Sequence, residues 1–97
     1  MPTHYDVGAV VEAAVDIDVD GVLTDPDALT VKYRDPSGNV VTKVSGTDPE
    51  VVRDSTGTYH IDIHAGQKGE WAVRWSGSGQ ASGAVEYSFH VRASRFP

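Results

Sequence analysis

The sequence contains no cysteine, so disulfide bonds, thiolate metal ligands and a cysteine nucleophile are all excluded. Long apolar runs are also absent, and none approaches the roughly 20 residues that a membrane-spanning helix requires. The first six residues lack the basic start and apolar stretch of a secretion signal, so none is expected. No segment of ten or more residues has the apolar spacing of an amphipathic helix. These absences predict a chain without helices that folds in a reducing compartment.

Positive charge is scarce, because eight Lys and Arg stand against fourteen Asp and Glu, which gives a net charge of −6. The cations are scattered between Lys32 and Arg95 and form no basic patch. Such a surface repels phosphate backbones and anionic lipids, so neither a nucleic acid nor a membrane is an expected partner. A chain of 97 residues has room for one domain and one core, with little left for a deep catalytic cavity.

The strongest positive feature is the alternation of apolar and polar residues, which is typical of half-buried strands. We expect strands over residues 11–19, 29–34, 40–44, 51–53, 59–64, 71–76 and 85–91. Trp71 and Trp75 fall on one strand face and are expected to anchor the core. The other expected inward-facing side chains are Val11, Ala13, Val15, Ile17, Val19, Leu29, Val31, Tyr33, Tyr59, Ile61, Ile63, Val73, Val85, Tyr87, Phe89 and Val91.

Turn residues separate these segments. Asp35-Pro36-Ser37-Gly38 predicts a tight hairpin turn, and further turns are expected at residues 54–57 and 65–69. Residues 76–83 are small and polar and are expected to form a mobile hairpin tip. About seven short antiparallel strands with turns between them predict an all-β, immunoglobulin-like β-sandwich over residues 8–91. Residues 1–7 are then an N-terminal arm and residues 92–97 a C-terminal tail.

One local pattern supports the immunoglobulin-like interpretation. The stretch Asp54-x-x-Gly57-x-Tyr59-x-Ile61 resembles the tyrosine corner of immunoglobulin domains, with Ile61 where a disulfide cysteine would stand. It departs from that pattern by one extra residue between Asp54 and Gly57 and by the lack of a cysteine pair.

The segment that starts at Asp16 has the spacing D-x-D-x-D-G-x₅-D, which is close to a calcium-binding loop. Its candidate ligands are Asp16, Asp18, Asp20 and Asp27. However, Ile17 and Val19 continue the strand alternation, so the backbone is expected to be extended and not wrapped around an ion. Asp27 also stands where a bidentate glutamate is usual. We therefore expect solvated aspartates that lead into a turn, with calcium binding as the alternative.

A second candidate metal group is His60-x-Asp62-x-His64, whose side chains share one strand face with about 7 Å between neighbours. Two histidines and an aspartate could bind zinc, and His4 or Asp6 could approach as a fourth ligand. The competing interpretation is a solvated outer face, which we favour. No G-x-S-x-G elbow or phosphate-binding loop is present, so we expect no catalytic residue, no metal, no cofactor and no enzymatic activity.

Several segments together resemble a group of short proteins of tailed phages and prophages of actinobacteria, encoded among the head and tail structural genes. They are residues 5–8, 31–40, 52–59, 69–75 and 88–91. The resemblance implies a virion component, in the head–tail connector region or as a capsid or tail decoration, made in the host cytoplasm. Its partners would be other virion proteins, including copies of itself in a symmetric assembly. The pattern is shared more loosely with bacterial immunoglobulin-like modules, so an adhesion module of a bacterial surface protein is the alternative, and a calcium-stabilised β module is the third.

The two ends of the chain are the expected attachment points. Residues 92–97 hold two of the eight cations and none of the fourteen acidic residues. Arginine and aromatic side chains are enriched at protein interfaces. We therefore expect Tyr5 in the N-terminal arm, and Arg92, Arg95 and Phe96 in the tail, to make the contacts with partner proteins.

Overall fold

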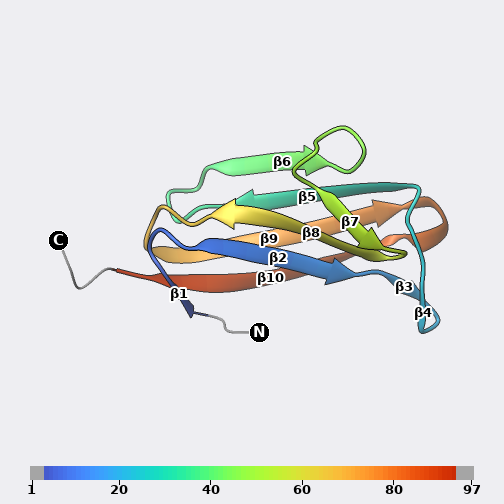
Figure 1. Ribbon diagram of the computed structural model, residues 1–97, viewed down its shortest axis with the longest axis horizontal. Coiled ribbons are helices and arrows are strands. Elements are labelled where there is room, and N and C mark those ends of the chain that lie inside the picture. The colour runs from blue at the N-terminus through green and yellow to red at the C-terminus, as the bar shows by residue number, and fades with distance from the viewer. Residues whose placement is uncertain (1–3, 94–97) are drawn as a thin grey trace.

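The computed structural model describes residues 4–93, which form an elongated all-β unit (Figure 1). Its strands are β1 (His4–Asp6), β2 (Val10–Asp16), β3 (Asp18–Val19), β4 (Val22–Leu23), β5 (Ala28–Arg34), β6 (Val40–Val44), β7 (Val52–Ser55), β8 (Thr58–His64), β9 (Gly69–Ser78) and β10 (Gly83–Arg92). A single 3₁₀ turn, η1 (Gly79–Ala81), is the only helical element among the described residues. No helix in residues 4–93 is long and apolar enough to cross a membrane.

The strands belong to two main sheets and one small hairpin. The larger sheet has the order β1-β10-β9-β5-β6, the smaller one has the order β2-β8-β7, and β3 pairs only with β4. All pairs are antiparallel except β1 with β10, which is parallel. Each of the seven segments expected to be extended contains at least one of the ten strands. The sequence did not predict the parallel strand β1, or the division of residues 11–19 into β2 and β3.

The core lies between the two main sheets, an arrangement consistent with a β-sandwich. Trp71, Val73 and Trp75 of β9 belong to the same buried cluster as Ile61 and Ile63 of β8, as the alternation predicts. No polar or charged residue among those described is fully buried. The remaining members of the buried cluster are Val11, Ala13, Val15, Leu29, Val31, Val51, Tyr59, Ala65, Phe89 and Val91.

Two parts of the expected pattern are wrong. Val19 and Val85 were expected to face the core but are 39% and 45% exposed. Val19 lies in the separate β3–β4 hairpin, and Val85 lines an open groove. Residues 76–83 were expected to form a mobile tip, yet Ser76 and Gly77 extend β9 and pair with Ala84 and Gly83. Main-chain pairing needs no large side chain, so a stretch of Gly and Ser can still extend a strand.

The two ends of the long axis differ in how they are closed. At the end that we call the Trp71 end, Phe89 stacks on Trp71 with ring centroids 5.9 Å apart and receives the edge of Tyr5 at 5.6 Å. Trp71 Nε1 donates to the Gln67 carbonyl at 3.0 Å. The side chain of Gln67 donates in turn to Asp35 at 2.9 Å. Aromatic packing and two linked turns therefore fill this end.

The other end, which we call the Trp75 end, contains the β3–β4 hairpin, η1 and the start of β10 (Figure 1). Here the sheets are joined by a chain of hydrogen bonds. Trp75 Nε1 donates to the Tyr87 hydroxyl at 3.2 Å, and that hydroxyl donates to the Ala14 carbonyl on β2 at 2.9 Å. Tyr87 thus connects β10 of the larger sheet to β2 of the smaller sheet. These two strands do not pair with each other in the described part of the chain.

Candidate interaction site

The structure places Tyr5 and Arg92, two of the four expected attachment residues, next to each other at the Trp71 end. Tyr5 pairs in register with Val91 and packs against the core, so residues 4–6 of the expected arm are part of the larger sheet. Arg92 is 61% exposed and makes an ion pair with Asp6 at 3.1 Å. The other two expected residues, Arg95 and Phe96, lie outside the described residues. β10 ends at this end of the molecule, at Arg92.

At the Trp75 end, the β3–β4 hairpin turns through Asp20 and Gly21, which both have positive φ, at 52° and 84°. Two positive φ values in succession are typical of a tight type I′ turn. Asp18 Oδ2 accepts a hydrogen bond from the Gly21 N–H at 3.2 Å. The predicted turn at residues 20–21 is confirmed, and the backbone before it is extended, as expected.

The four candidate calcium ligands do not converge on one point. No three of the carboxylates of Asp16, Asp18, Asp20 and Asp27 lie within 4.8 Å of one another. Asp16 Oδ1 accepts from the Thr58 hydroxyl at 3.2 Å instead. None of the ion pairs within residues 4–93 involves any of the four. The Trp75 end therefore carries aspartates whose charge no nearby cation balances.

A groove of about 150 Å³ opens between the two sheets at this end. Its apolar lining includes Val15, Ile17, Leu29, Trp75 and Val85. Asp16 and Asp18 also line it. The sequence predicted none of this cavity, because it is formed where β2 and β3 separate from the start of β10.

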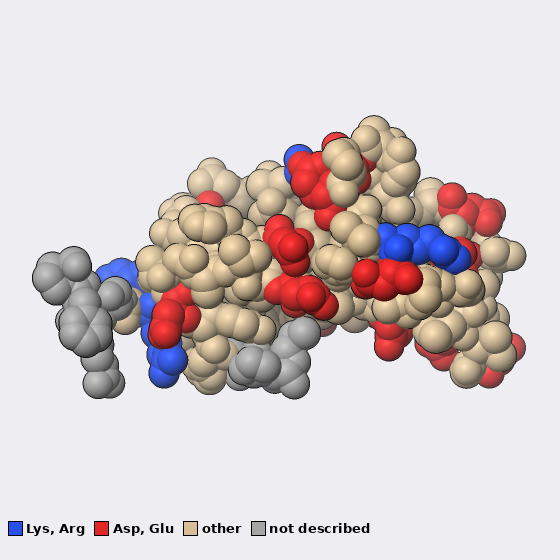
Figure 2. Space-filling view, in the orientation of Figure 1, with Lys and Arg blue, Asp and Glu red and all other residues tan. Residues whose placement is uncertain are grey.

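Exposed apolar side chains lie in the β3–β4 hairpin, whose Asp18 lines the groove, and at Val85 in the lining itself. Val22 and Leu23 of the β3–β4 hairpin are 66% and 46% exposed, in addition to Val19 and Val85. Figure 2 shows acidic side chains on the surface around this hairpin. An apolar patch rimmed by charged residues is typical of an interaction surface.

Two strand edges are also open next to the groove. β10 pairs with β9 along its length, but on its other side β1 reaches only His90, Val91 and Arg92. Residues 83–89 of β10 thus have no strand partner on that side within the described part of the chain. β2 likewise pairs only with β8. Unpaired N–H and C=O groups on such edges can pair with another extended segment.

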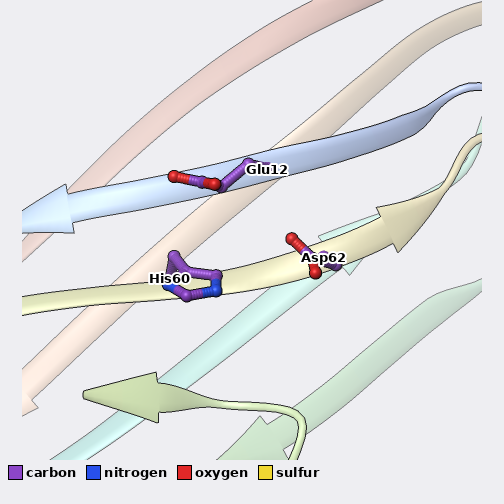
Figure 3. A group of neighbouring side chains, drawn as sticks. All are labelled: Glu12, His60 and Asp62. Atoms are coloured by element: carbon purple, nitrogen blue, oxygen red, sulfur yellow. The ribbon is translucent and has the colours of Figure 1, made fainter. Parts of the chain in front are cut away.

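The predicted His60-Asp62-His64 group is replaced by a different set of neighbours. The group that forms is Glu12, His60 and Asp62, whose ligand atoms lie within 4.8 Å of one another on the outer face of the smaller sheet (Figure 3). His64 is on the same strand face but is not part of it. Sequence reasoning missed Glu12 because it comes from β2, directly opposite Asp62 in the register with β8.

His60 is already engaged by a carboxylate. Its Nδ1 lies 2.7 Å from Asp54 Oδ2 on β7. This hydrogen bond raises the pKa of His60 above its usual value, with smaller contributions from the charges of Asp54, Glu12 and Asp62, although burial opposes the shift. A protonated His60 balances part of the negative charge of the three carboxylates. His60 and the three carboxylates therefore form a group of interacting charges on the outer face of the smaller sheet.

Asp25, which sequence reasoning also missed, holds the crossover between β4 and β5 against the β7–β8 turn. It accepts from Arg53 at 2.9 Å, from the Gly57 N–H at 2.8 Å and from the Tyr59 hydroxyl at 2.9 Å. The Arg53 hydrogen bonds, followed by that of Gly57, hold the pKa of Asp25 far below its usual value. Tyr59 thus bonds to a distant side chain and not to nearby backbone, so the expected tyrosine corner is wrong.

No protein-family model, curated protein or solved structure matches this chain.

Proposed function

We propose that this chain is a non-enzymatic structural protein of a virion, in the head–tail connector region or as a decoration of capsid or tail, that acts by docking onto other virion proteins. The observation that carries the docking function is the Trp75 end, where a groove is lined by the exposed Val85 and by Asp16 and Asp18, which make no ion pair within residues 4–93. Val22, in the β3–β4 hairpin that contains Asp18, is also exposed. The virion assignment comes from the sequence resemblance.

We further propose that the fold is an immunoglobulin-like sandwich. The strand order supports this assignment: β10, β9, β5 and β6 follow the order G-F-C-C′, and β2, β8 and β7 follow the order B-E-D. The chain crosses between the two main sheets from β1 to β2, from β2 through the β3–β4 hairpin to β5, from β6 to β7 and from β8 to β9. The parallel pairing of β1 with β10 corresponds to a short first strand that joins the G strand.

The experiment is to ask whether the chain is a component of purified particles. Cells that encode it are induced to release particles, the particles are banded on a density gradient and washed in high salt, and the chain is quantified by mass spectrometry. We expect recovery in a fixed ratio to the major capsid or tail protein. A chain that is missing from washed particles would overturn the virion assignment.

The same material separates the alternative function. An antibody raised against the purified domain should label banded particles and not intact cells. Labelling of intact cells without labelling of particles would favour an adhesion module of a surface protein, for which the exposed apolar groove offers an equally suitable contact.

A further inference from the structure

We infer that the groove at the Trp75 end binds the C-terminal tail of a second copy of this chain, so that copies associate head to tail. This inference deepens the docking function proposed above and rests on it. It names the partner as the same protein and names the two contacting parts, the groove of one copy and residues 92–97 of the next.

The groove has the size and lining for one aromatic side chain. Its volume is about 150 Å³, and its apolar lining combines the exposed Val85 with the almost fully buried Val15, Leu29 and Trp75. Apolar cavities of about this volume accept a benzene ring. The tail supplies one aromatic residue, Phe96.

The charges of the two parts are complementary. Asp16 and Asp18 line the groove, and Asp20 follows in the hairpin turn, while no cation within residues 4–93 makes an ion pair with any of them. The tail contains no acidic residue and two arginines, Arg92, which already makes an ion pair with Asp6 of its own chain, and Arg95. Opposite charges across an interface fix its register and speed association, and their effect weakens as salt rises.

The tail cannot fill the groove of its own chain. Phe96 is four residues beyond Arg92, so it can lie at most about 14 Å from the end of β10. Val85, at the groove, is seven residues back along the same strand, which is about 23 Å. The groove is therefore available only to the tail of another molecule.

The open edge of β10 provides a path for the incoming segment. Within the described part of the chain, residues 83–89 have no strand partner on this side, and an extended peptide can add to such an edge as an extra strand. A contact between two different surfaces of identical copies is heterologous and produces a ring or a filament. Either geometry suits a component that is repeated around or along a particle.

Indole signals in ¹⁵N NMR spectra of the full-length chain test this inference, because Trp75 lines the groove and Trp71 lies at the other end. The labelled acceptor is the full chain with Arg95→Glu and Phe96→Ala, which disables its own tail. Unlabelled wild-type chain is the donor, added up to about 1 mM, which detects binding as weak as about 4 kcal/mol. We expect the Trp75 indole signal to shift while that of Trp71 stays in place, and the shift to decrease at high salt.

Two variants make the test specific. Donor chain with Arg95→Glu and Phe96→Ala should cause no shift, and this change leaves the acceptor untouched. Acceptor with a further Val85→Arg should lose the shift, whereas Val52→Arg should keep it, because Val52 is similarly exposed, at 40% against 45%, but lies on the outer sheet face. A Trp75 signal that does not move with wild-type donor, or moves equally with the disabled donor, overturns the inference.

The outcome is independent of the virion assignment. Tail-dependent association of the purified chain would support head-to-tail docking even if the protein were missing from particles. Conversely, a protein that is recovered in particles but shows no tail-dependent shift would keep the proposed function and lose this inference.

Discussion

The Trp71 end and the Trp75 end of the molecule are built from the same alternating strands but are closed in different ways. At the Trp71 end, three aromatic rings from Tyr5, Phe89 and Trp71 pack together and fill the space between the strands. At the Trp75 end, the sheets separate around a groove and are held by hydrogen bonds through Tyr87 and Asp25. Aromatic packing fills the Trp71 end, whereas hydrogen bonds hold the two sheets together at the Trp75 end and leave a groove between them.

This difference shows how a small domain can keep a contact surface without losing its core. A chain of this size buries a limited share of its surface, so every apolar side chain left exposed reduces the stabilisation of the fold. Val19, Val22, Leu23 and Val85 are exposed at the Trp75 end, and Val7, Val10 and Val40 are exposed near the other end. The buried aromatic residues at the opposite end provide the stability that permits this exposure.

The largest expected effect is the loss of aromatic packing at the Trp71 end. Phe89→Ala should destabilise the fold by about 3–5 kcal/mol, because it removes a buried ring that contacts both Tyr5 and Trp71. Val85→Ala at the Trp75 end should change stability by less than about 0.5 kcal/mol, because Val85 is 45% exposed. Urea unfolding followed by tryptophan fluorescence measures both. Equal losses for the two variants would contradict the contrast between the ends.

The next effect concerns the hydrogen bonds that connect the sheets at the Trp75 end. Tyr87→Phe leaves the Trp75 indole N–H and the Ala14 carbonyl without their shared partner, which should cost about 1–3 kcal/mol. Tyr33→Phe is the matched control, because Tyr33 is also half-buried against the core but its hydroxyl makes none of the hydrogen bonds within residues 4–93. If the two variants lose the same stability in urea, the Tyr87 hydroxyl does not connect the sheets.

The pattern of residues predicted the core strands well because burial repeats every second residue there. Residues 59–64 and 71–75 alternate as expected, and Trp71 and Trp75 are both buried. The same rule failed for Val85, since alternation determines which face a side chain is on but not whether the opposite sheet covers that face. The side chain of Val85 is on the inward face of its strand, but it lines the groove and is not covered by the opposite sheet.

The parts of the site that sequence reasoning missed depend on contacts between distant segments. Glu12 joins His60 and Asp62 only through the register of β2 with β8, and Asp25 reaches Tyr59 across 34 positions of the chain. The spacing of residues within one strand carries no information about such register. The outward position of Glu12 on its strand was a usable signal, because it limited the partners to the outer face of a neighbouring strand.

A smaller, pH-dependent effect should test the hydrogen bonds of Asp25 at the Trp75 end. The pKa of Asp25 is lower in the folded chain than its ordinary value of 3.8, so its stabilisation is complete above that value and is lost as pH falls below it. Asp25→Asn should therefore lower the urea midpoint at pH 7 and reduce the further loss between pH 5 and pH 3, these being about the limits of carboxylate titration. Asp27→Asn is the control, because the Asp27 side chain makes no hydrogen bond or ion pair within residues 4–93. An unchanged pH profile for Asp25→Asn would show that other carboxylates control acid unfolding.

The smallest expected effect is that of calcium on the aspartates of the Trp75 end. If Asp16, Asp18, Asp20 and Asp27 formed a specific site, calcium at 100 times its Kd would add about 2.7 kcal/mol and raise the melting midpoint by at least about 10 °C. Their carboxylates do not converge, so 1 mM calcium in place of EDTA should move the midpoint by less than about 2 °C, an effect of ionic screening alone. Magnesium at the same concentration should act alike. A rise of many degrees that is specific to calcium and lost in Asp18→Ala would instead favour the calcium-stabilised module, and would mean that the hairpin rearranges around an ion. In that case the negative charge at the groove would be neutralised, and the attraction proposed for the basic tail of a second copy would weaken as calcium is added.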